Sequence, residues 1–255
     1  MSDTDMKVLL FDIETSLAQV YTYGLYDQNI SIANVIEHPR MIAFTAKWLG
    51  KPKVFAFSEY HQSRTEMLTA MHELLDEADL VVGWNSKNFD VKWVNSEFMV
   101  ENMLPPSPYK QLDLMQEVKR NARFLSNKLD YISERLLNDN KVEYNMARMW
   151  IKVNNPNTSE AERKKEWNAM LKYAKKDTAL LEPMFNDLRP WLRLPHPVQE
   201  GEDRCRNCGS HDLERRGVAR TLNGTYQRYQ CRSCGAWSRG TLRTPTTNMR
   251  NIVYA

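Results

Sequence analysis

The fold of this chain is decided by the stretch K-V-L-L-F-D-I-E at residues 7–14, an apolar run that ends in two acidic residues. The apolar part is short and has no polar face, as expected of a central strand that helices cover on both sides. Side chains two apart on an extended chain share a face, so Asp12 and Glu14 emerge together at the strand's end. The stretch therefore predicts an α/β domain with a pair of carboxylates at the end of a buried strand.

Two further motifs carry acidic residues that can reach the same place. The motif N-S-K-N-F-D at residues 85–90 follows the apolar run 80–82, and its Asp90 opens an amphipathic stretch, which predicts a strand-to-helix junction. In the motif Y-A-K-K-D, Tyr173 and Asp177 are four apart in a long helical pattern, so both project from one helix face. One strand end, one junction and one helix can meet at a single point.

Four carboxylates gathered at one point need a positive charge, because they would otherwise repel one another or take up protons. Ligand sets of oxygen alone select hard cations, so Mg²⁺ or Mn²⁺ is the expected cofactor. Two such ions about 4 Å apart can activate a water molecule and stabilise the leaving oxygen when a phosphoryl group is displaced in line. The acidic motifs therefore predict a two-metal site for phosphodiester hydrolysis.

Each motif also has an ordinary interpretation when it is taken alone. An acidic pair after a strand is common in α/β proteins, an Asp at a helix N-terminus is favoured by the helix dipole, and the helical pair is typical of a solvated helix edge. The order of the motifs and their strand and helix contexts favour one joint site over three coincidences.

The set of motifs resembles the DEDD superfamily of 3′-to-5′ exonucleases, in the DEDDy subgroup whose third motif carries Tyr in place of His. The segments L-D-L-M at residues 112–115 and L-S-N-K-L-D-Y-I at residues 125–132 are similar to the middle of proofreading domains in family B DNA polymerases. The resemblance covers roughly residues 6–190. It implies a ribonuclease H-like fold, a mixed sheet with helices on both faces.

The resemblance also assigns roles to individual residues. It implies that Tyr173 orients the attacking water, which suits a phenol because a pKa near ~10 keeps it protonated at neutral pH. The residues that it implies for binding the two ions are Asp12, Glu14, Asp90 and Asp177. The residues that it implies for contact with the terminal nucleotides are Thr15, Asn85 and Phe89.

The periodicity of the first 190 residues predicts alternating strands and helices. Expected strands cover residues 6–12, 41–48, 53–58 and 79–83. Expected helices cover residues 64–77, 90–101, 111–121, 128–138 and 159–188, and Pro183 should kink or restart the last of them. A polar insertion, either a lid or a surface loop, is expected at residues 154–165.

All four cysteines lie in two pairs, Cys205-x-x-Cys208 and Cys231-x-x-Cys234. Two such pairs fit a tetrahedral Zn²⁺ site, and the glycine after each second cysteine gives the turn its backbone freedom. A disulfide framework is disfavoured because the chain shows no secretory signal, and a redox pair is the usual interpretation of a single Cys-x-x-Cys. The segment resembles a structural zinc ribbon.

A polar stretch with several prolines separates the two parts of the chain. We expect an exonuclease domain at 1–190, a linker at 191–203 and the zinc ribbon with its tail at 204–255. Charge divides in the same way. Residues 204–250 hold ten arginines, no lysine and two acidic residues, a formal charge of +8, which leaves −5 for the rest of the chain.

The arginine-rich segment predicts contact with a polyanion, since arginine binds phosphate and stacks on bases. Tyr226, Tyr229 and Trp237 add aromatic faces, which favours single-stranded nucleic acid. The alternative is a basic zinc domain that docks on the first domain or on a protein partner. The arginines expected to hold the phosphate backbone are Arg215, Arg216, Arg220 and Arg228.

Together these features predict a metal-dependent 3′-to-5′ exonuclease that releases nucleoside monophosphates from single-stranded or frayed DNA ends. Two alternatives stay open: a non-catalytic nucleic-acid-binding or targeting module, and an exonuclease that acts on RNA. A repulsive set of acids has little use in a non-catalytic module, and the polymerase-like segments favour DNA over RNA. A replication or repair protein is a further candidate partner.

Composition and hydropathy predict a soluble, cytoplasmic protein with no membrane partner. No apolar run approaches the roughly 20 residues of a membrane span, and the acidic start lacks the pattern of a signal peptide. With 255 residues, 42% of them hydrophobic, the chain can build one full α/β domain and a small appendage.

Overall fold

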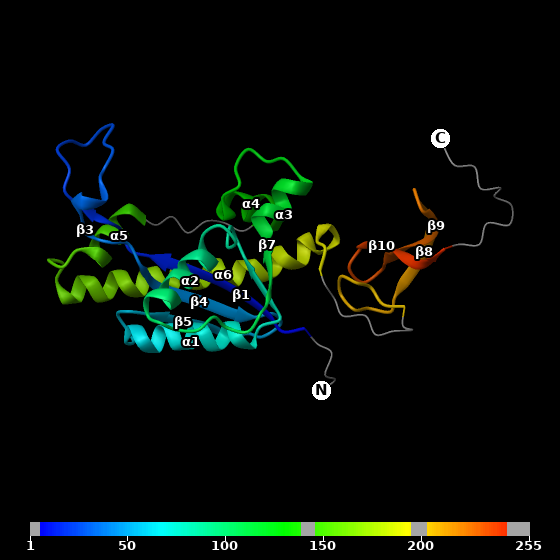
Figure 1. The fold of residues 1–255 in the computed structure, drawn as a ribbon, viewed down its shortest axis with the longest axis horizontal. Helices are drawn as coiled ribbons and strands as arrows, with labels where there is room; N and C mark the ends of the chain where they lie inside the picture. The colour runs from blue at the N-terminus through cyan, green and yellow to red at the C-terminus, as the bar shows by residue number, and fades with distance from the viewer. Residues whose placement is uncertain (1–5, 139–145, 195–202, 244–255) are drawn as a thin grey trace. The chain divides into compact units, whose positions relative to one another are not determined.

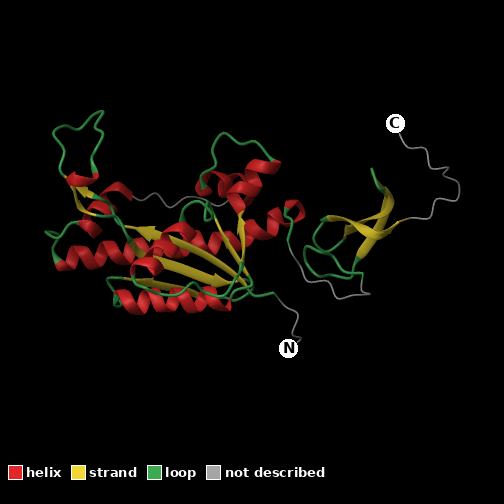
Figure 2. Cartoon of the chain, in the orientation of Figure 1, coloured by secondary structure: helices red, strands yellow, loops and turns green. Residues whose placement is uncertain are grey.

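The computed structural model describes residues 6–138, 146–194 and 203–243. The chain falls into two compact units that divide between Phe185 and Asn186. Figure 2 shows strands between layers of helices in the first unit, whereas residues 203–243 form strands and loops alone.

The first unit is built on a mixed sheet of five strands in the order β5-β4-β1-β6-β7. β1 (Val8–Thr15) pairs in parallel with β6 (Leu80–Gly83), which pairs in parallel with β7 (Lys110–Asp113). On its other edge β1 pairs antiparallel with β4 (Met41–Trp48), and β4 pairs antiparallel with β5 (Val54–Ser58). The apolar run of β1 therefore lies in the central strand of the sheet, as the sequence predicts.

One face of β1 lies in the main hydrophobic core. Leu9, Phe11 and Ile13 belong to this core with residues of α1 (Arg64–Glu77) and α2 (Asp90–Val100). Because side chains alternate along a strand, the residues between them, including Asp12 and Glu14, point to the other face.

That other face is covered by α6 (Glu160–Leu188), which runs alongside β1 and β4 in Figure 1. Trp167 and Met170 of α6 join a second buried cluster with Met149 of α5 (Met146–Asn154) and with residues of β4. Helices thus cover both faces of the sheet, as the ribonuclease H-like expectation requires.

Shorter elements connect the layers. β1 is followed by a two-stranded excursion, β2 (Gln19–Val20) and β3 (Val35–Glu37), which also contains the 3-10 turn η1 (Ile32–Asn34). β7 is followed by α3 (Leu114–Asn121) and α4 (Leu129–Leu137).

The structure adds β2, β3 and α5 where no element is expected, and it departs from the expected elements at several further positions. β1 extends to Thr15 because β4 pairs with it beyond the end of β6, so Glu14, expected after the strand, lies inside it together with Asp12. Residues 110–113, expected to be partly helical, form β7 beside β6. α6 is one continuous helix through Pro183, so the helix does not restart there. Residues 155–159 form a short connection between α5 and α6 rather than a long insertion.

The second unit contains a three-stranded antiparallel sheet with the order β10-β9-β8. Its strands are β8 (Leu213–Thr221), β9 (Gly224–Cys231) and β10 (Trp237–Arg243). The 3-10 turn η2 (Arg189–Trp191) also belongs to this unit, and the Asn207 side chain donates a hydrogen bond to the Arg189 carbonyl.

Candidate active site

The register of β1 and β4 fixes the direction in which the first two acids point. Asp12 lies opposite Thr45, so the two side chains share a face of the sheet. The Thr45 hydroxyl donates to the Ala174 carbonyl over 3.1 Å and lies 2.6 Å from the Thr178 hydroxyl, and both partners belong to α6. Asp12, and Glu14 two residues later, therefore face α6.

The same contacts fix the residues of the third motif. Ala174 and Thr178 are buried against β4, and each directly follows one of the two motif residues, Tyr173 and Asp177. The Tyr173 hydroxyl hydrogen-bonds the Asp177 carboxylate. The helical spacing that predicts a shared face for this pair is thus realised beside β1.

Asp90 is attached to β1 by a backbone hydrogen bond. Pairing between β1 and β6 ends at Leu10 and Val82, so the next N–H groups on that edge of β1 have no strand partner. Ile13 donates its N–H to the Asp90 carboxylate over 3.0 Å. Asp90 therefore reaches the strand between Asp12 and Glu14.

The loop before Asp90 needs a glycine to approach β1. A Cβ atom at Gly83 would lie 2.5 Å from the Ser86 Cβ and 3.1 Å from the Phe11 carbonyl oxygen. Contacts this short exclude any side chain at Gly83, so the turn after β6 can close over β1 only without one.

Asp113 holds the same loop from the other side. Its buried carboxylate accepts N–H groups from Asn85 (3.0 Å), Lys87 (3.3 Å) and Gln116 (3.2 Å). Asn85 has a φ of 63°, in the left-handed region, and its amide is thereby turned toward Asp113. In the sequence, Asp113 stands out only as part of a polymerase-like segment. Asp is a common N-cap residue, so its place before α3 indicates no particular function.

Burial raises the pKa of every acid in the cluster, and repulsion from other acids adds to each shift: from cluster members for Asp12 and Glu14, from Asp113 for Asp90 and from Asp130 for Asp177. Burial, with repulsion from the neighbouring acids, raises the pKa of Asp12 well above its usual value. Burial likewise raises the pKa of Glu14 to about 8, and repulsion from Asp177 and Asp90 adds to it. Burial also raises the pKa of Asp90 to about 7, although the Ile13 N–H opposes the shift. At neutral pH the cluster needs either protons or a cation.

Asp177 is the least shifted of the four acids. Burial raises the pKa of Asp177 to about 6, the Tyr173 hydroxyl lowers it, and Asp130 of α4 raises it by repulsion. Asp130 is a further acid near the cluster, and its place in the first turn of a helix is common and gives no functional signal of its own. Burial and the surrounding carboxylates raise the pKa of Tyr173 as well, so its hydroxyl stays protonated.

The donor set fits hard divalent cations. Asp12, Glu14, Asp90 and Asp177 offer carboxylate oxygen alone, which suits Mg²⁺ or Mn²⁺. Among the described residues only the four cysteine sulfurs form a group of ligand atoms that all lie within 4.8 Å of one another. The carboxylates are spaced more widely than the ligands of the cysteine site.

Three residues expected along the substrate border the cluster. Thr15 is the last residue of β1, where the register with β4 shifts by one residue. Asn85 and Phe89 lie in the loop that ends at Asp90, and 39% of Phe89 is exposed, with its ring edge-on to Trp93. These three residues lie near the cluster because they are close to its acids in the sequence. Among the described residues no contact connects one of the three to another.

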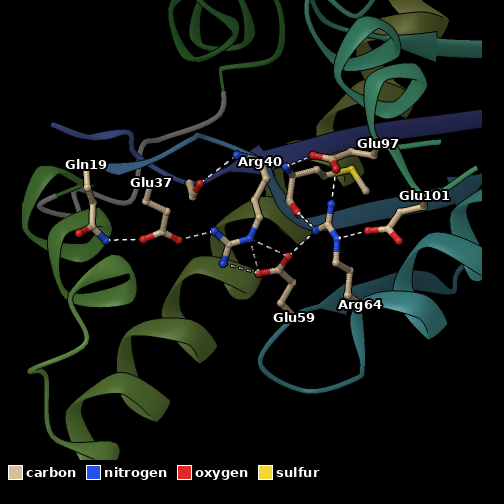
Figure 3. Close-up of polar contacts among 9 residues, drawn as sticks. Gln19, Glu37, Arg40, Glu59, Arg64, Glu97 and Glu101 are labelled. Carbon is tan, nitrogen blue, oxygen red and sulfur yellow. Dashed lines mark hydrogen bonds and ion pairs between the residues drawn. The ribbon is translucent and has the colours of Figure 1, made fainter. Parts of the chain in front are cut away.

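A network of charged side chains fixes the end of β1. Figure 3 shows Glu59 between Arg40 and Arg64; Arg40 binds it through two nitrogens, and Arg64 binds it at 2.5 Å. Arg64 also bonds Glu97 of α2 and Glu101, the residue that follows α2.

The network reaches the backbone at both ends. Buried Glu97 accepts the Met41 N–H at 2.6 Å, and Ser16 exchanges two hydrogen bonds with Arg40. It therefore ties β4 and the residue after Thr15 to α2, the helix that begins with Asp90.

The four cysteines gather as their spacing predicts. All are free thiols, with Sγ atoms 3.6 Å apart for Cys205 and Cys234 and for Cys208 and Cys231. Four sulfurs about 2.3 Å from one tetrahedral ion would be spaced by about 3.8 Å. Burial raises the pKa of Cys208 and of Cys234, so a cation is needed to hold them as thiolates. The cluster is consistent with structural zinc.

The two cysteine turns have the same backbone. Gly209 donates to the Cys205 carbonyl and Gly235 to the Cys231 carbonyl, each over 2.8 Å. Both glycines have a φ of 74°, a conformation that other residues rarely adopt. The glycines that follow each second cysteine therefore shape both turns.

The four arginines expected to bind phosphate are divided between the faces of the ribbon sheet. Arg215 pairs with Tyr229 and Arg220 with Thr225, which places both arginines on one face. Arg228 is the neighbour of Tyr229 on β9 and points to the other face. Arg216 precedes a register shift in β8, and its side chain pairs with Glu214 at 3.1 Å.

Comparison with known proteins agrees with the fold. Residues 9–189 match a family model described as RNase_H superfamily. No curated protein matches the chain. None of the helices in the described residues has the length and apolar character required to cross a membrane.

Proposed function

Because the chain belongs to the RNase H superfamily, we propose that residues 1–190 form a metal-dependent 3′-to-5′ exonuclease that hydrolyses the terminal phosphodiester bond of nucleic acid. One observation carries the proposal. Asp12 and Glu14 face α6 from β1, and Asp90 accepts the Ile13 N–H between them. Gathering three acids beside a fourth on a buried strand does not stabilise the fold, because each acid is costly to ionise there.

The roles of the acids follow from their chemistry. When bound, two divalent ions would supply an activated water and a counter-charge for the leaving oxygen. The carboxylates would hold these ions, and the pKa of about 8 for Glu14 marks how strongly the site favours positive charge. The proposed ligands are Asp12, Glu14, Asp90 and Asp177.

Tyr173 is proposed to orient the attacking water. Its raised pKa rules out a role as general base at neutral pH, so its hydroxyl can only donate or accept a hydrogen bond. The bond to Asp177 gives that hydroxyl a fixed position beside a proposed ligand.

The substrate is proposed to be DNA, on the strength of the polymerase-like segments at residues 112–115 and 125–132. Thr15, Asn85 and Phe89 would contact the terminal nucleotides, with the exposed Phe89 ring available for stacking. The zinc ribbon at 204–255, joined by the linker 191–203, would hold the strand.

The test uses 5′-labelled DNA and RNA oligonucleotides, single- and double-stranded, with Mg²⁺ or Mn²⁺. We expect products that shorten from the 3′ end, and loss of this ladder in the isosteric variant Asp12→Asn. Faster cleavage of RNA would reassign the polymer. No metal-dependent cleavage of any substrate, with binding retained, would refute the exonuclease and favour a non-catalytic targeting module.

A further inference from the structure

The ribbon sheet has two faces of different chemistry. On β9 and β10, Arg228 lies opposite Arg239 and Tyr226 opposite Arg243, and opposed residues share a face. Trp237 lies opposite Gln230. Gln230 is two residues after Arg228 on β9, so both side chains, and with them Trp237, point to the same face. We call this the stacked face; it consists of Tyr226, Arg228, Trp237, Arg239 and Arg243.

The opposite face carries fewer charges. It consists of Arg215 and Arg220 of β8 with Tyr229 and Thr225 of β9. The same face continues to Leu213, which packs on the buried cysteine cluster. One end of this face is therefore occupied by the metal site.

Two guanidinium groups of the stacked face lie over aromatic rings. The Arg239 Cζ is 4.3 Å from the Tyr226 ring centroid, and the Arg228 Cζ is 4.9 Å from that of Trp237. Trp237 remains 51% exposed. Each pair thus presents a flat, positively charged surface to solvent.

The backbone holds Arg228 in this position. Its Nε donates to the Arg216 carbonyl over 2.9 Å. That carbonyl is available because β8 shifts register between Arg215 and Val218, where Gly217 has a φ of 68°. The shift places an acceptor beside Arg228, so the guanidinium is already ordered before any ligand binds.

The positive charge on this face is not balanced. Arg228 and Arg239 lie directly opposite each other, an arrangement of like charges that destabilises a sheet. Glu214 lies on the same face, opposite Gln230, but it pairs with Arg216 and Arg232, and within the described part of the chain neither Arg228 nor Arg239 forms an ion pair. Uncompensated, ordered arginines indicate a polyanionic ligand.

We propose that the stacked face binds single-stranded nucleic acid, with unpaired bases stacking on the two arginine–aromatic pairs and phosphates bound by the guanidinium edges. The inference rests on the proposed function and names the form of its substrate. A duplex keeps its bases stacked on one another and offers such a surface only phosphates, whereas a single strand offers bases as well.

Two double variants with the same charge change test which face binds. Arg228→Gln/Arg239→Gln and Arg215→Gln/Arg220→Gln each remove two arginines from the full-length chain. Fluorescence anisotropy of a labelled single-stranded 20-mer is measured over a series of salt concentrations, without added divalent ion. Zinc content and thermal unfolding verify that each variant is folded.

We expect the stacked-face variant to bind at least about tenfold more weakly. The slope of log K against log salt should fall by about 1.4, because two phosphate contacts are lost at about 0.7 each. The opposite-face variant should stay within about threefold of the parent protein, with an unchanged slope, because binding is assigned to the stacked face and not to Arg215 and Arg220, which the sequence alone suggests as phosphate ligands. Equal losses in both variants, or none in either, would overturn the assignment of the face.

Abasic strands test the stacking. The parent protein should bind an ordinary single strand about tenfold more tightly than an abasic strand of equal length or a duplex. Trp237→Leu should lose that preference while retaining its salt slope. Equal affinity of the parent protein for all three ligands would show that phosphates alone are bound, and would overturn the single-strand inference.

Failure here and failure of the exonuclease proposal are distinguishable. Binding is measured without divalent ion, so its outcome does not depend on hydrolysis. If 3′ ends are cleaved but the face variants bind normally, only the ribbon inference fails. If the face selects single strands but no substrate is cleaved, only the exonuclease fails.

Discussion

At the scale of single residues, Asp113 is the clearest positioning group near the site. It touches none of the proposed ligands through a hydrogen bond, yet it accepts two N–H groups from the loop that leads to Asp90. A buried carboxylate in this role replaces the strand pairing that the loop lacks. Asp90 is therefore held by β1 on one side and, through its loop, by β7 on the other.

We predict that Asp113→Asn weakens the metal site as well as the fold. An amide has one acceptor oxygen where the carboxylate has two, and its NH₂ group would face N–H donors. Unfolding free energy should fall by about 1–3 kcal/mol, and Mn²⁺ affinity, measured by titration calorimetry, by at least about tenfold. Asp76→Asn is the control, since Asp76 accepts the Ser107 N–H of a different loop. Equal Mn²⁺ binding in both variants would assign Asp113 a purely structural role.

The shifted carboxyl groups predict a pH dependence of stability. Glu14 and Asp90 have pKa values raised to about 8 and about 7 from values near 4 in the unfolded chain. Between these limits the folded state binds more protons than the unfolded state, so stability falls as pH rises from about 4 to 8. Urea unfolding without added divalent ion should show this decline, and Glu14→Gln should reduce it.

A divalent ion should remove most of the decline, because it replaces the protons. For the same reason exonuclease activity should rise between pH 6 and 8 at limiting Mg²⁺. Stability that is independent of pH without added ion would contradict the shifted values.

At the scale of elements, the charged network at the end of β1 joins the parts that carry the acids. Arg64 alone bonds Glu59, Glu97 and Glu101. Glu97 lies two turns after Asp90 on α2 and is buried. The orientation of α2, and with it of Asp90, therefore depends on a cation supplied by α1.

We predict that Arg64→Ala destabilises the first unit by about 2–4 kcal/mol, because it leaves Glu97 buried without its cation. The expected loss is smaller than for a fully buried ion pair, because Arg64 itself is partly exposed. The control is Lys7→Ala, whose ion pair with Glu77 is exposed and should contribute less than about 1 kcal/mol. Similar small losses in both variants would show that the network does not stabilise α2.

Much of this architecture was predictable from sequence, and the misses have physical causes. The start of α2 at Asp90 follows from a strand-to-helix pattern, and β1 from its unbroken apolar run. The sequence does not predict β7, because Leu112 and Asp113 are buried beside the neighbouring strand β6 and the segment has no strand pattern of its own. The excess length of β1 was missed for the same reason, since pairing with β4 is not encoded locally.

The candidate site, like the fold, could be predicted from the sequence only in part. The spacing of Tyr173 and Asp177 predicts a shared helix face, whereas the contacts of Thr45 with Ala174 and Thr178 turn that face toward the sheet. Asp113 and Asp130 act through contacts across the sheet and from α4, which no local pattern announces. Register also decides which ribbon arginines share a face, and a sequence count of arginines cannot supply it.

At the scale of the whole molecule, the charge is divided between an acidic N-terminal part, which carries the proposed active site, and a basic ribbon. The residues from 204 to 250 carry +8 and the rest −5. If the ribbon holds the strand while the first unit cuts it, the ribbon contributes binding energy that is the same before and during the reaction. Such uniform binding lowers KM and leaves kcat unchanged.

We therefore predict that Cys231→Ser/Cys234→Ser raises KM for a 20-mer by at least about tenfold and changes kcat by less than about twofold. Two hydroxyls in place of thiolates remove half the ligand set, and a zinc site of this kind supplies the folding energy of its domain. A trinucleotide, which offers the ribbon few phosphates, should show a smaller rise in KM than the 20-mer. Ser233→Ala, in the same turn, keeps all four thiols and serves as the control. A large fall in kcat would instead place the ribbon in the chemical step, because the loss of uniform binding energy changes KM alone.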